Sequence, residues 1–148
     1  IAIVGSREYP HRHLVREFVW ELAPDTVVIS GAAPGVDATV AVAARLRGLQ
    51  LIEFPAEAPS DDGFPGDLRL IEWTRRAYER NQKIVDAADR MVAFWDEDSG
   101  GTLDAIRRAR FKGIPVEIIG RNRRPIAPSS HPALKELWAA TAPKKERT

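Results

Sequence analysis

Two kinds of apolar pattern alternate along the chain. Short runs of apolar and β-branched residues are separated by longer segments in which apolar residues recur every three or four positions. The short runs are typical of buried strands, and the longer spacing is typical of helices that pack one face against a core. The runs predict strands at residues 1–4, 26–29, 49–54, 91–95 and 114–119. The longer segments predict helices at residues 11–22, 38–46, 68–88, 102–112 and 131–140.

The order of these elements predicts the fold class. Strands that alternate with helices are typical of parallel sheets, because each parallel connection needs a crossover. We therefore expect a Rossmann-like, doubly wound α/β fold, with helices on both faces of a mainly parallel sheet of five or more strands. Residues 1–120 are expected to form this domain. Residues 121–148 are a basic, proline-rich C-terminal extension, for which we expect a short helix and a disordered tail from Pro143.

Three of the predicted strands end in turns rich in glycine and hydroxyl side chains. In a parallel sheet these turns share the carboxyl edge, where α/β proteins bind ligands. Glycine lets the backbone approach a ligand closely, and the free N–H groups at a helix start attract anions. The candidate ligand-binding residues in these turns are Gly5, Ser6, Arg7, Ser30, Gly31, Gly35, Asp37, Ser99, Gly100, Gly101 and Thr102. The alternative is that the glycines only shape tight turns.

The turn at residues 99–102 is the strongest candidate for a phosphate site, because it leads from a buried strand into a helix. We expect the N–H groups of residues 100–102 to face the phosphate. Arg7 could pair with a phosphate or a carboxylate, or be an ordinary surface arginine. Asp37 could bind a ribose hydroxyl, or simply be an acid favoured at a helix start.

The predicted helix at residues 68–88 carries three further candidates. Arg80 and Asn81 are polar residues that either belong to the site or lie on an exposed face. Trp73 is most simply a packing residue, but it is the tryptophan that could line a base pocket. Leu70 and Ile71 are expected to pack against the core.

Composition narrows the classes of function. The net charge is +1, so the chain as a whole lacks a basic field for nucleic acid, and there are no cysteines for disulfides, thiolate catalysis or metal ligation. The absence of cysteine fits a cytoplasmic protein, and no apolar run is long enough to span a membrane. The three histidines lack metal-ligand spacing, and residues 96–98 are more simply a solvated acidic turn than a metal or acid–base site. We expect neither a metal nor a cofactor.

Three stretches resemble a known superfamily. They are IVGSR, SGAAPGVDATVAVAAR and RNQKIVDAADRMVAFWDEDSGGTLDAIRRARFKGIPV, and together they fall within residues 1–119. Their combination and order resemble the SLOG superfamily of Rossmannoid nucleotide-binding domains. This superfamily includes the lonely-guy (LOG) enzymes, the DNA-processing protein DprA (Smf) and YspA-like proteins, and the resemblance is greatest to the YspA-like group.

The resemblance implies a pocket for a nucleotide or a nucleotide-derived ligand. Our leading hypothesis is that the protein senses or carries this ligand. Ser30, Gly31, Gly35 and Asp37 would take the positions of the second-strand loop, and residues 100–102 those of the phosphate loop. It also implies a homodimer, because related domains often pair through helices.

The lonely-guy enzymes suggest an alternative, hydrolysis of the N-glycosidic bond of nucleoside 5′-monophosphates. Arg80 matches their catalytic arginine, but Ala105 stands where their catalytic acid would be. Asp104 is adjacent, and one helical residue turns it away by about 100°. Asp37 or the acids Asp61 and Asp62 could substitute for the missing carboxylate.

A second alternative is single-stranded DNA binding of the DprA type. The basic residues that could contact backbone phosphates are Arg121, Arg123, Arg124, Lys144, Lys145 and Arg147. The near-zero net charge and the lack of interleaved aromatic residues weigh against nucleic acid as the partner.

Overall fold

The computed structural model describes residues 1–59 and 66–141, and it has the predicted α/β fold. Its five strands are Ala2–Gly5 (β1), Val27–Ser30 (β2), Gln50–Glu53 (β3), Met91–Phe94 (β4) and Val116–Ile119 (β5). Its α-helices are Arg12–Trp20 (α1), Val36–Arg47 (α2), Gly66–Ala87 (α3), Gly100–Lys112 (α4) and Pro132–Ala140 (α5). A short 3-10 helix, Pro128–Ser130 (η1), precedes α5. Asp61, Asp62 and the tail from Pro143 lie outside the described residues.

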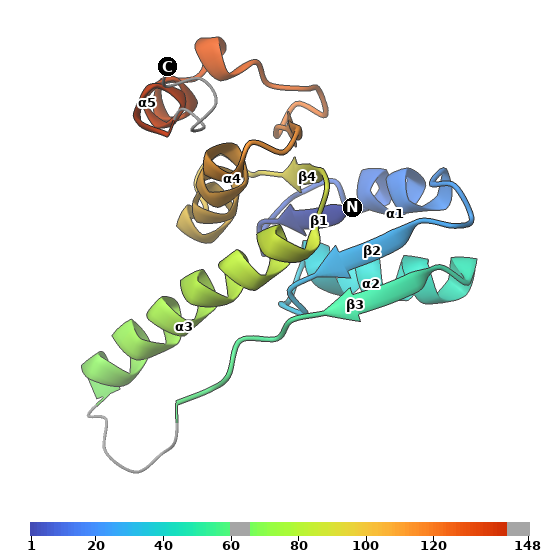
Figure 1. Cartoon of the computed structure of the whole chain (residues 1–148), viewed down its shortest axis with the longest axis horizontal. Coiled ribbons are helices and arrows are strands. Elements are labelled where there is room, and N and C mark those ends of the chain that lie inside the picture. The colour runs from blue at the N-terminus through green and yellow to red at the C-terminus, as the bar shows by residue number, and fades with distance from the viewer. Residues whose placement is uncertain (60–65, 142–148) are drawn as a thin grey trace.

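The strands form one parallel sheet in the order β3-β2-β1-β4-β5 (Figure 1). The chain first builds outward from β1 to β3, and α3 then carries it back across the sheet to β4 on the other side of β1. The order of connections therefore reverses between β1 and β4. Their register pairs Gly5 with Phe94, so the two strands end side by side. Such a switch point opens a crevice at the carboxyl edge of a sheet.

Alternating side chains of the central strands supply two separate cores. Ile3 and Phe94 belong to the cluster beneath α1 and α2. Val4 and Ala93 belong to the cluster beneath α3, α4 and α5. Both faces of the sheet are therefore covered, as expected for strands that are apolar at nearly every position.

Helices α2 and α4 both begin two residues earlier than the sequence pattern predicts. Val36 and Asp37 lie in the first turn of α2, and Gly100 and Gly101 lie in the first turn of α4. The start of α2 packs so closely on β1 that a Cβ atom added at Gly5 would lie 2.6 Å from Val36. Two helix N-termini therefore point at the carboxyl edge of the sheet.

The N-terminal half of α3 extends away from the sheet (Figure 1). Leu70 and Ile71 are 68% and 64% exposed, so the expectation that they pack in the core is wrong. The helical spacing in this stretch reflects a face that no strand lies beneath. The C-terminal half of α3 does pack, and Ile84 and Val85 are buried in the core.

The described part of the C-terminal extension packs on the domain and forms hydrogen bonds with it. Leu134 and Leu137 of α5 are buried in the core cluster beneath α4. The Ile126 amide donates to the Ile118 carbonyl at 2.8 Å, and the Tyr9 hydroxyl donates to the Gly120 carbonyl at 2.9 Å. In the part of the chain that is described, no helix is both long and apolar enough to cross a membrane.

Candidate functional site

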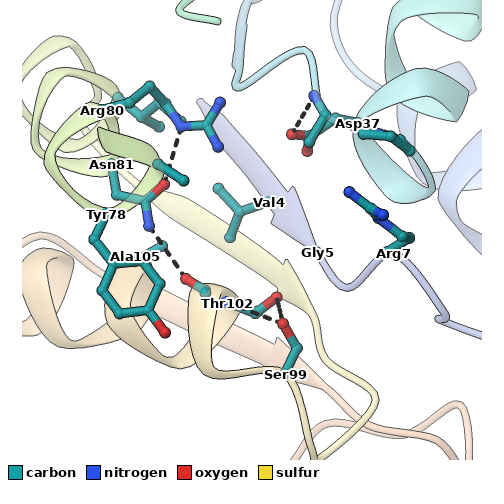
Figure 2. Close-up of a pocket in the computed structure, with 15 residues that line it drawn as sticks. Val4, Gly5, Arg7, Asp37, Tyr78, Arg80, Asn81, Ser99, Thr102 and Ala105 are labelled. Carbon is teal, nitrogen blue, oxygen red and sulfur yellow. Dashed lines mark hydrogen bonds between the residues drawn. The ribbon is translucent and has the colours of Figure 1, made fainter. Parts of the chain in front are cut away.

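A pocket of about 210 Å³ lies at the switch point, above the ends of β1 and β4. Figure 2 shows Val4 and Gly5 at its base, with Asp37 and Arg7 on one side and Arg80, Asn81 and Tyr78 on the other. The start of α4 closes the remaining side. The residues that line the pocket are Val4, Gly5, Arg7, Ala33, Pro34, Asp37, Ala77, Tyr78, Arg80, Asn81, Ile84, Ser99, Gly101, Thr102 and Ala105.

The first turn of α4 is anchored by a chain of hydroxyl groups. Ser99 is the N-cap residue, and its Oγ accepts from the Thr102 amide at 3.4 Å and from the Thr102 hydroxyl at 3.3 Å. Ser6 Oγ lies 3.3 Å from Thr102 Oγ1 and accepts the Asp96 amide at 3.0 Å. The buried Trp95 indole donates to the Ser99 carbonyl at 3.1 Å. These bonds fix the helix start against β1 and β4.

The two glycines of this turn have different surroundings. A Cβ atom at Gly100 would lie 2.8 Å from the Tyr78 hydroxyl, and Gly100 lines a neighbouring groove between α4 and α5. A Cβ atom at Gly101 would meet nothing closer than 3.9 Å, and Gly101 lines the pocket. Gly101 is therefore the glycine of this turn that lines the pocket, and the Thr102 amide is already bonded to Ser99 Oγ.

Asp37 is a buried carboxylate with one unsatisfied oxygen. It is 6% exposed, and Oδ2 accepts the Ala33 amide at 3.1 Å. Within the described part of the chain, Oδ1 has no hydrogen-bond partner, nor has the buried Ser30 hydroxyl. Burial raises the pKa of Asp37 to about 6, although the Ala33 amide, the charge of Arg80, the neighbouring Ser30 hydroxyl and the Gly31 amide act against this rise. A buried carboxyl of this kind is suited to hold a proton.

Arg80 joins three segments at the edge of the pocket. Its Nη1 donates to the Gly31 carbonyl and, at 3.1 Å, to the Phe54 carbonyl. A Cβ atom at Gly31 would lie 2.6 Å from Arg80 Nη1 and 2.9 Å from Asp37 Oδ2, so only glycine leaves room for this arrangement. Burial lowers the pKa of the Arg80 guanidinium, which the charge of Asp37 opposes.

Arg7 is the second cation of the pocket, and it is exposed. Its backbone is fixed by contact with Gly35, whose φ is +88° and whose Cβ position would lie 2.5 Å from the Arg7 carbonyl oxygen. No hydrogen-bond or ion-pair partner among the described residues holds its guanidinium. The close Gly35 contact therefore fixes the Arg7 backbone beside the pocket, and the guanidinium has no partner among the described residues.

Asn81 links α3 to α4. Its Nδ2 donates to the Gly101 carbonyl at 3.2 Å and to Asp104 Oδ2 at 3.1 Å, while its Oδ1 accepts from Arg80 Nε at 3.3 Å. Asp104 also pairs with Arg107 and Arg108, both at 2.8 Å. Asp104 is thus occupied outside the pocket, whereas Ala105 faces it, as the helical geometry predicts.

In the acidic turn at residues 96–98, the Asp96 side chain binds backbone amides of the turn itself. Asp96 Oδ1 accepts the amides of Asp98 and Ser99 at 2.9 and 2.8 Å. Burial by itself would raise the pKa of Asp96, but these amides bring it below the usual range. Glu97 contacts His131 at 3.6 Å. Across residues 1–59 and 66–141, no group of three acidic or histidine side chains is arranged to hold a metal ion.

The structure brings together eight of the residues singled out from the sequence. Those that line the pocket are Gly5, Arg7, Asp37, Arg80, Asn81, Ser99, Gly101 and Thr102. The other five, which do not line it, are Ser6, Ser30, Gly31, Gly35 and Gly100. Sequence reasoning missed the pocket-facing Ala77, Tyr78 and Ile84. Residues at the spacing of Ala77, Arg80, Asn81 and Ile84 share one face of a helix. The helical period, applied from the predicted Arg80 and Asn81, could therefore have identified Ala77 and Ile84 as residues that line the pocket.

The comparisons with known proteins agree with the fold. No protein-family model and no curated protein sequence matches the chain. A solved structure does match, the X-ray structure of DNA processing protein A (DprA) from Streptococcus pneumoniae, with a TM-score of 0.67 and 20% identity. The match covers 96% of this chain and 56% of the DprA chain, so this chain spans little more than half of that protein. The chain therefore shares the Rossmannoid fold of DprA.

Proposed function

We propose that this protein is a SLOG-type domain that binds the phosphate of a nucleotide or nucleotide-derived ligand in the pocket at the switch point. The phosphate would lie at the N-terminus of α4, near Gly101 and Ser99. Arg7 would supply a compensating charge, and Asp37 would accept a ribose hydroxyl. The protein would then act as a sensor or carrier of that ligand.

The observation that carries this proposal is that Arg7 lines the same pocket as the N-terminus of α4, and that its guanidinium has no partner among the described residues. Oriented amides and a nearby arginine are a favourable environment for a phosphate dianion. Asp37 also lines the pocket, and its carboxylate repels a phosphate dianion but can accept a hydrogen bond from a sugar hydroxyl. The donors and the acceptor thus match the two polar parts of a nucleotide.

A thermal-shift series tests the proposal. The purified protein is heated with inorganic phosphate, AMP, ATP, NAD or ADP-ribose. A ligand at ten times its Kd raises the Tm of a protein of this size by about 3–6 °C. In Gly101→Asp the shift should vanish, because the added carboxylate repels phosphate, while the open space around Gly101 preserves the fold. In Arg7→Ala the shift should become smaller.

Arg90→Ala is the matched control. Arg90 is also exposed, but it lies just before β4, at the opposite edge of the sheet. This variant should keep the full ligand shift. The proposal fails if none of these compounds shifts the wild-type Tm at millimolar concentration, or if Gly101→Asp and Arg7→Ala both retain the wild-type shift.

Hydrolysis of the N-glycosidic bond of a nucleoside 5′-monophosphate is a second candidate function, favoured by Asp37. With a pKa of about 6, this carboxyl can hold a proton near neutral pH. It would give that proton to the departing base as water adds to C1′, which yields free base and ribose 5-phosphate. Chromatography of AMP incubated with the protein tests this reaction. Release of adenine that Asp37→Asn abolishes would support it, and unchanged AMP would exclude it for that substrate.

DNA is the alternative suggested by the name of the structural neighbour, DNA processing protein A, and we propose a single strand as the form to test. Arg121, Arg123 and Arg124 are exposed in the turn after β5. The His11 ring contact with the Arg121 carbonyl, at 2.8 Å, places this turn beside α1. Fluorescence anisotropy of a labelled oligothymidylate in increasing salt tests it, since phosphate contacts weaken steeply with ionic strength. Lys144, Lys145 and Arg147 lie outside the described residues.

A further inference from the structure

A second, larger compartment adjoins the phosphate pocket. It has a volume of about 550 Å³ and lies between the loops after β2 and β3 and the N-terminal half of α3. It shares five lining residues with the phosphate pocket, namely Arg7, Ala33, Pro34, Ala77 and Arg80. The two compartments therefore lie side by side, with both arginines on their common boundary.

The two compartments differ in chemistry. The phosphate pocket contains Asp37, Ser99 and Thr102, whereas the second compartment is lined by Pro55, Leu70 and Trp73. Trp73 is 37% exposed and Leu70 is 68% exposed, so both apolar side chains present surface to solvent. Apolar surface in a concave site is covered favourably by a planar, weakly hydrated group.

We propose that the second compartment binds the nucleobase of the ligand, by contact with the Trp73 ring, while the phosphate lies at α4. This inference rests on the proposed function and adds a ligand class to it, a nucleoside 5′-phosphate with its base in place. The ribose would lie between the two compartments, with a hydroxyl toward the Asp37 carboxylate of the phosphate pocket. A tryptophan face stacks on any base, so this site favours an aromatic heterocycle over a plain sugar phosphate.

The helical register of α3 supports a single ligand that spans both compartments. Trp73, Ala77 and Arg80 follow one another at intervals of four and three residues, so they lie on one face of the helix. Trp73 lines the base compartment, and Ala77 and Arg80 line both compartments. The same face of α3 thus runs from the apolar end of the site to the polar end.

The experiment compares nucleotides with ribose 5-phosphate by isothermal titration calorimetry. AMP, GMP, CMP and UMP carry the base, and ribose 5-phosphate carries the phosphate and sugar alone. We expect the best nucleotide to bind wild type at least about ten-fold more tightly than ribose 5-phosphate, which is within the range for one base stacked on an aromatic ring. Trp73→Ala should remove this preference and leave the affinity for ribose 5-phosphate within about two-fold.

Two further variants make the test specific. Trp73→Phe should retain part of the preference, because phenylalanine still offers an aromatic face. Trp20→Ala should retain all of it, because Trp20 is 53% exposed at the end of α1 and lines neither compartment.

Equal affinity of wild type for the four nucleotides and ribose 5-phosphate overturns the base site but leaves the phosphate proposal standing. Equal weakening of every compound by Trp73→Ala also overturns it. If no compound binds wild type, both proposals fail.

Discussion

Ser6 Oγ lies 3.3 Å from Thr102 Oγ1, although the two residues are separated by 96 positions in the sequence. Ser6 follows β1 and Thr102 lies in the first turn of α4, so this contact joins the two turns on either side of the switch point. Ser6 also accepts the Asp96 amide at 3.0 Å. One buried hydroxyl therefore holds the end of β1 against the start of α4.

Replacing this hydroxyl is expected to destabilise the fold. Ser6→Ala leaves the Asp96 amide without its acceptor, and an unsatisfied group of this kind costs about 1–3 kcal/mol. Urea denaturation measures the loss in the free energy of unfolding. Ser129→Ala, at an exposed serine, should change this free energy by less than about 0.5 kcal/mol. Equal stability of the two variants would contradict the structural role of Ser6.

Asp37 should make stability depend on pH in a direction opposite to that of most carboxylates. Its pKa is about 6 in the folded protein, and the unfolded chain has the ordinary value of about 3.9. The folded state therefore binds the proton more tightly. The contribution of Asp37 to stability is full below about pH 4 and is lost as the pH rises through 6. A shift of this size corresponds to roughly 3 kcal/mol.

The measurement is the free energy of unfolding of wild type minus that of Asp37→Asn, from urea titrations at several pH values. This difference should fall between pH 4 and pH 8. Asp25→Asn, at an exposed carboxyl, should show no such fall. A difference that stays constant or rises with pH would show that Asp37 does not hold its proton in the folded state.

Gly31 and Gly101 should respond differently to the same small change. An added methyl group at Gly31 would lie 2.6 Å from Arg80 Nη1, so the guanidinium must move and release the Gly31 carbonyl. Gly31→Ala should therefore lower the free energy of unfolding by about 1–3 kcal/mol, the cost of a lost bond to a charged group. Gly101→Ala has space for the methyl group and should be neutral or slightly stabilising. Thermal denaturation of both variants checks the contrast, which fails if they behave alike.

The C-terminal extension should contribute to stability despite its exposed, basic start. Leu134 of α5 has no exposed surface, and Leu134→Ala should cost about 2–5 kcal/mol because it leaves a cavity beneath α4. Leu46→Ala, at a leucine that is 73% exposed, should cost little. Chemical denaturation measures both. A small loss for Leu134→Ala would mean that α5 is dispensable for the fold of the rest of the chain.

The sequence by itself determined the order and approximate bounds of the main helices and strands, and the fold class. Buried strands such as β4 are apolar at nearly every position, and a helix repeats its apolar residues with its own period, so each segment carries its own signal. The glycine and hydroxyl residues after three strands also placed the candidate site at one edge of the sheet, because parallel strands end on the same side. The resemblance to the lonely-guy motif, together with the turn of about 100° between neighbouring helical residues, was enough to place Ala105, and not Asp104, toward the pocket.

Only the tertiary structure decided which of these residues meet and in what state. The strand order brings β1 next to β4 and so puts Ser6 beside Thr102. The burial of Asp37, its raised pKa and its unpartnered oxygen depend on segments far apart in the chain. The exposure of Leu70 depends on where the sheet ends beneath α3. A periodic pattern reports the two faces of its own segment, whereas burial and electrostatics depend on what the fold packs against each face.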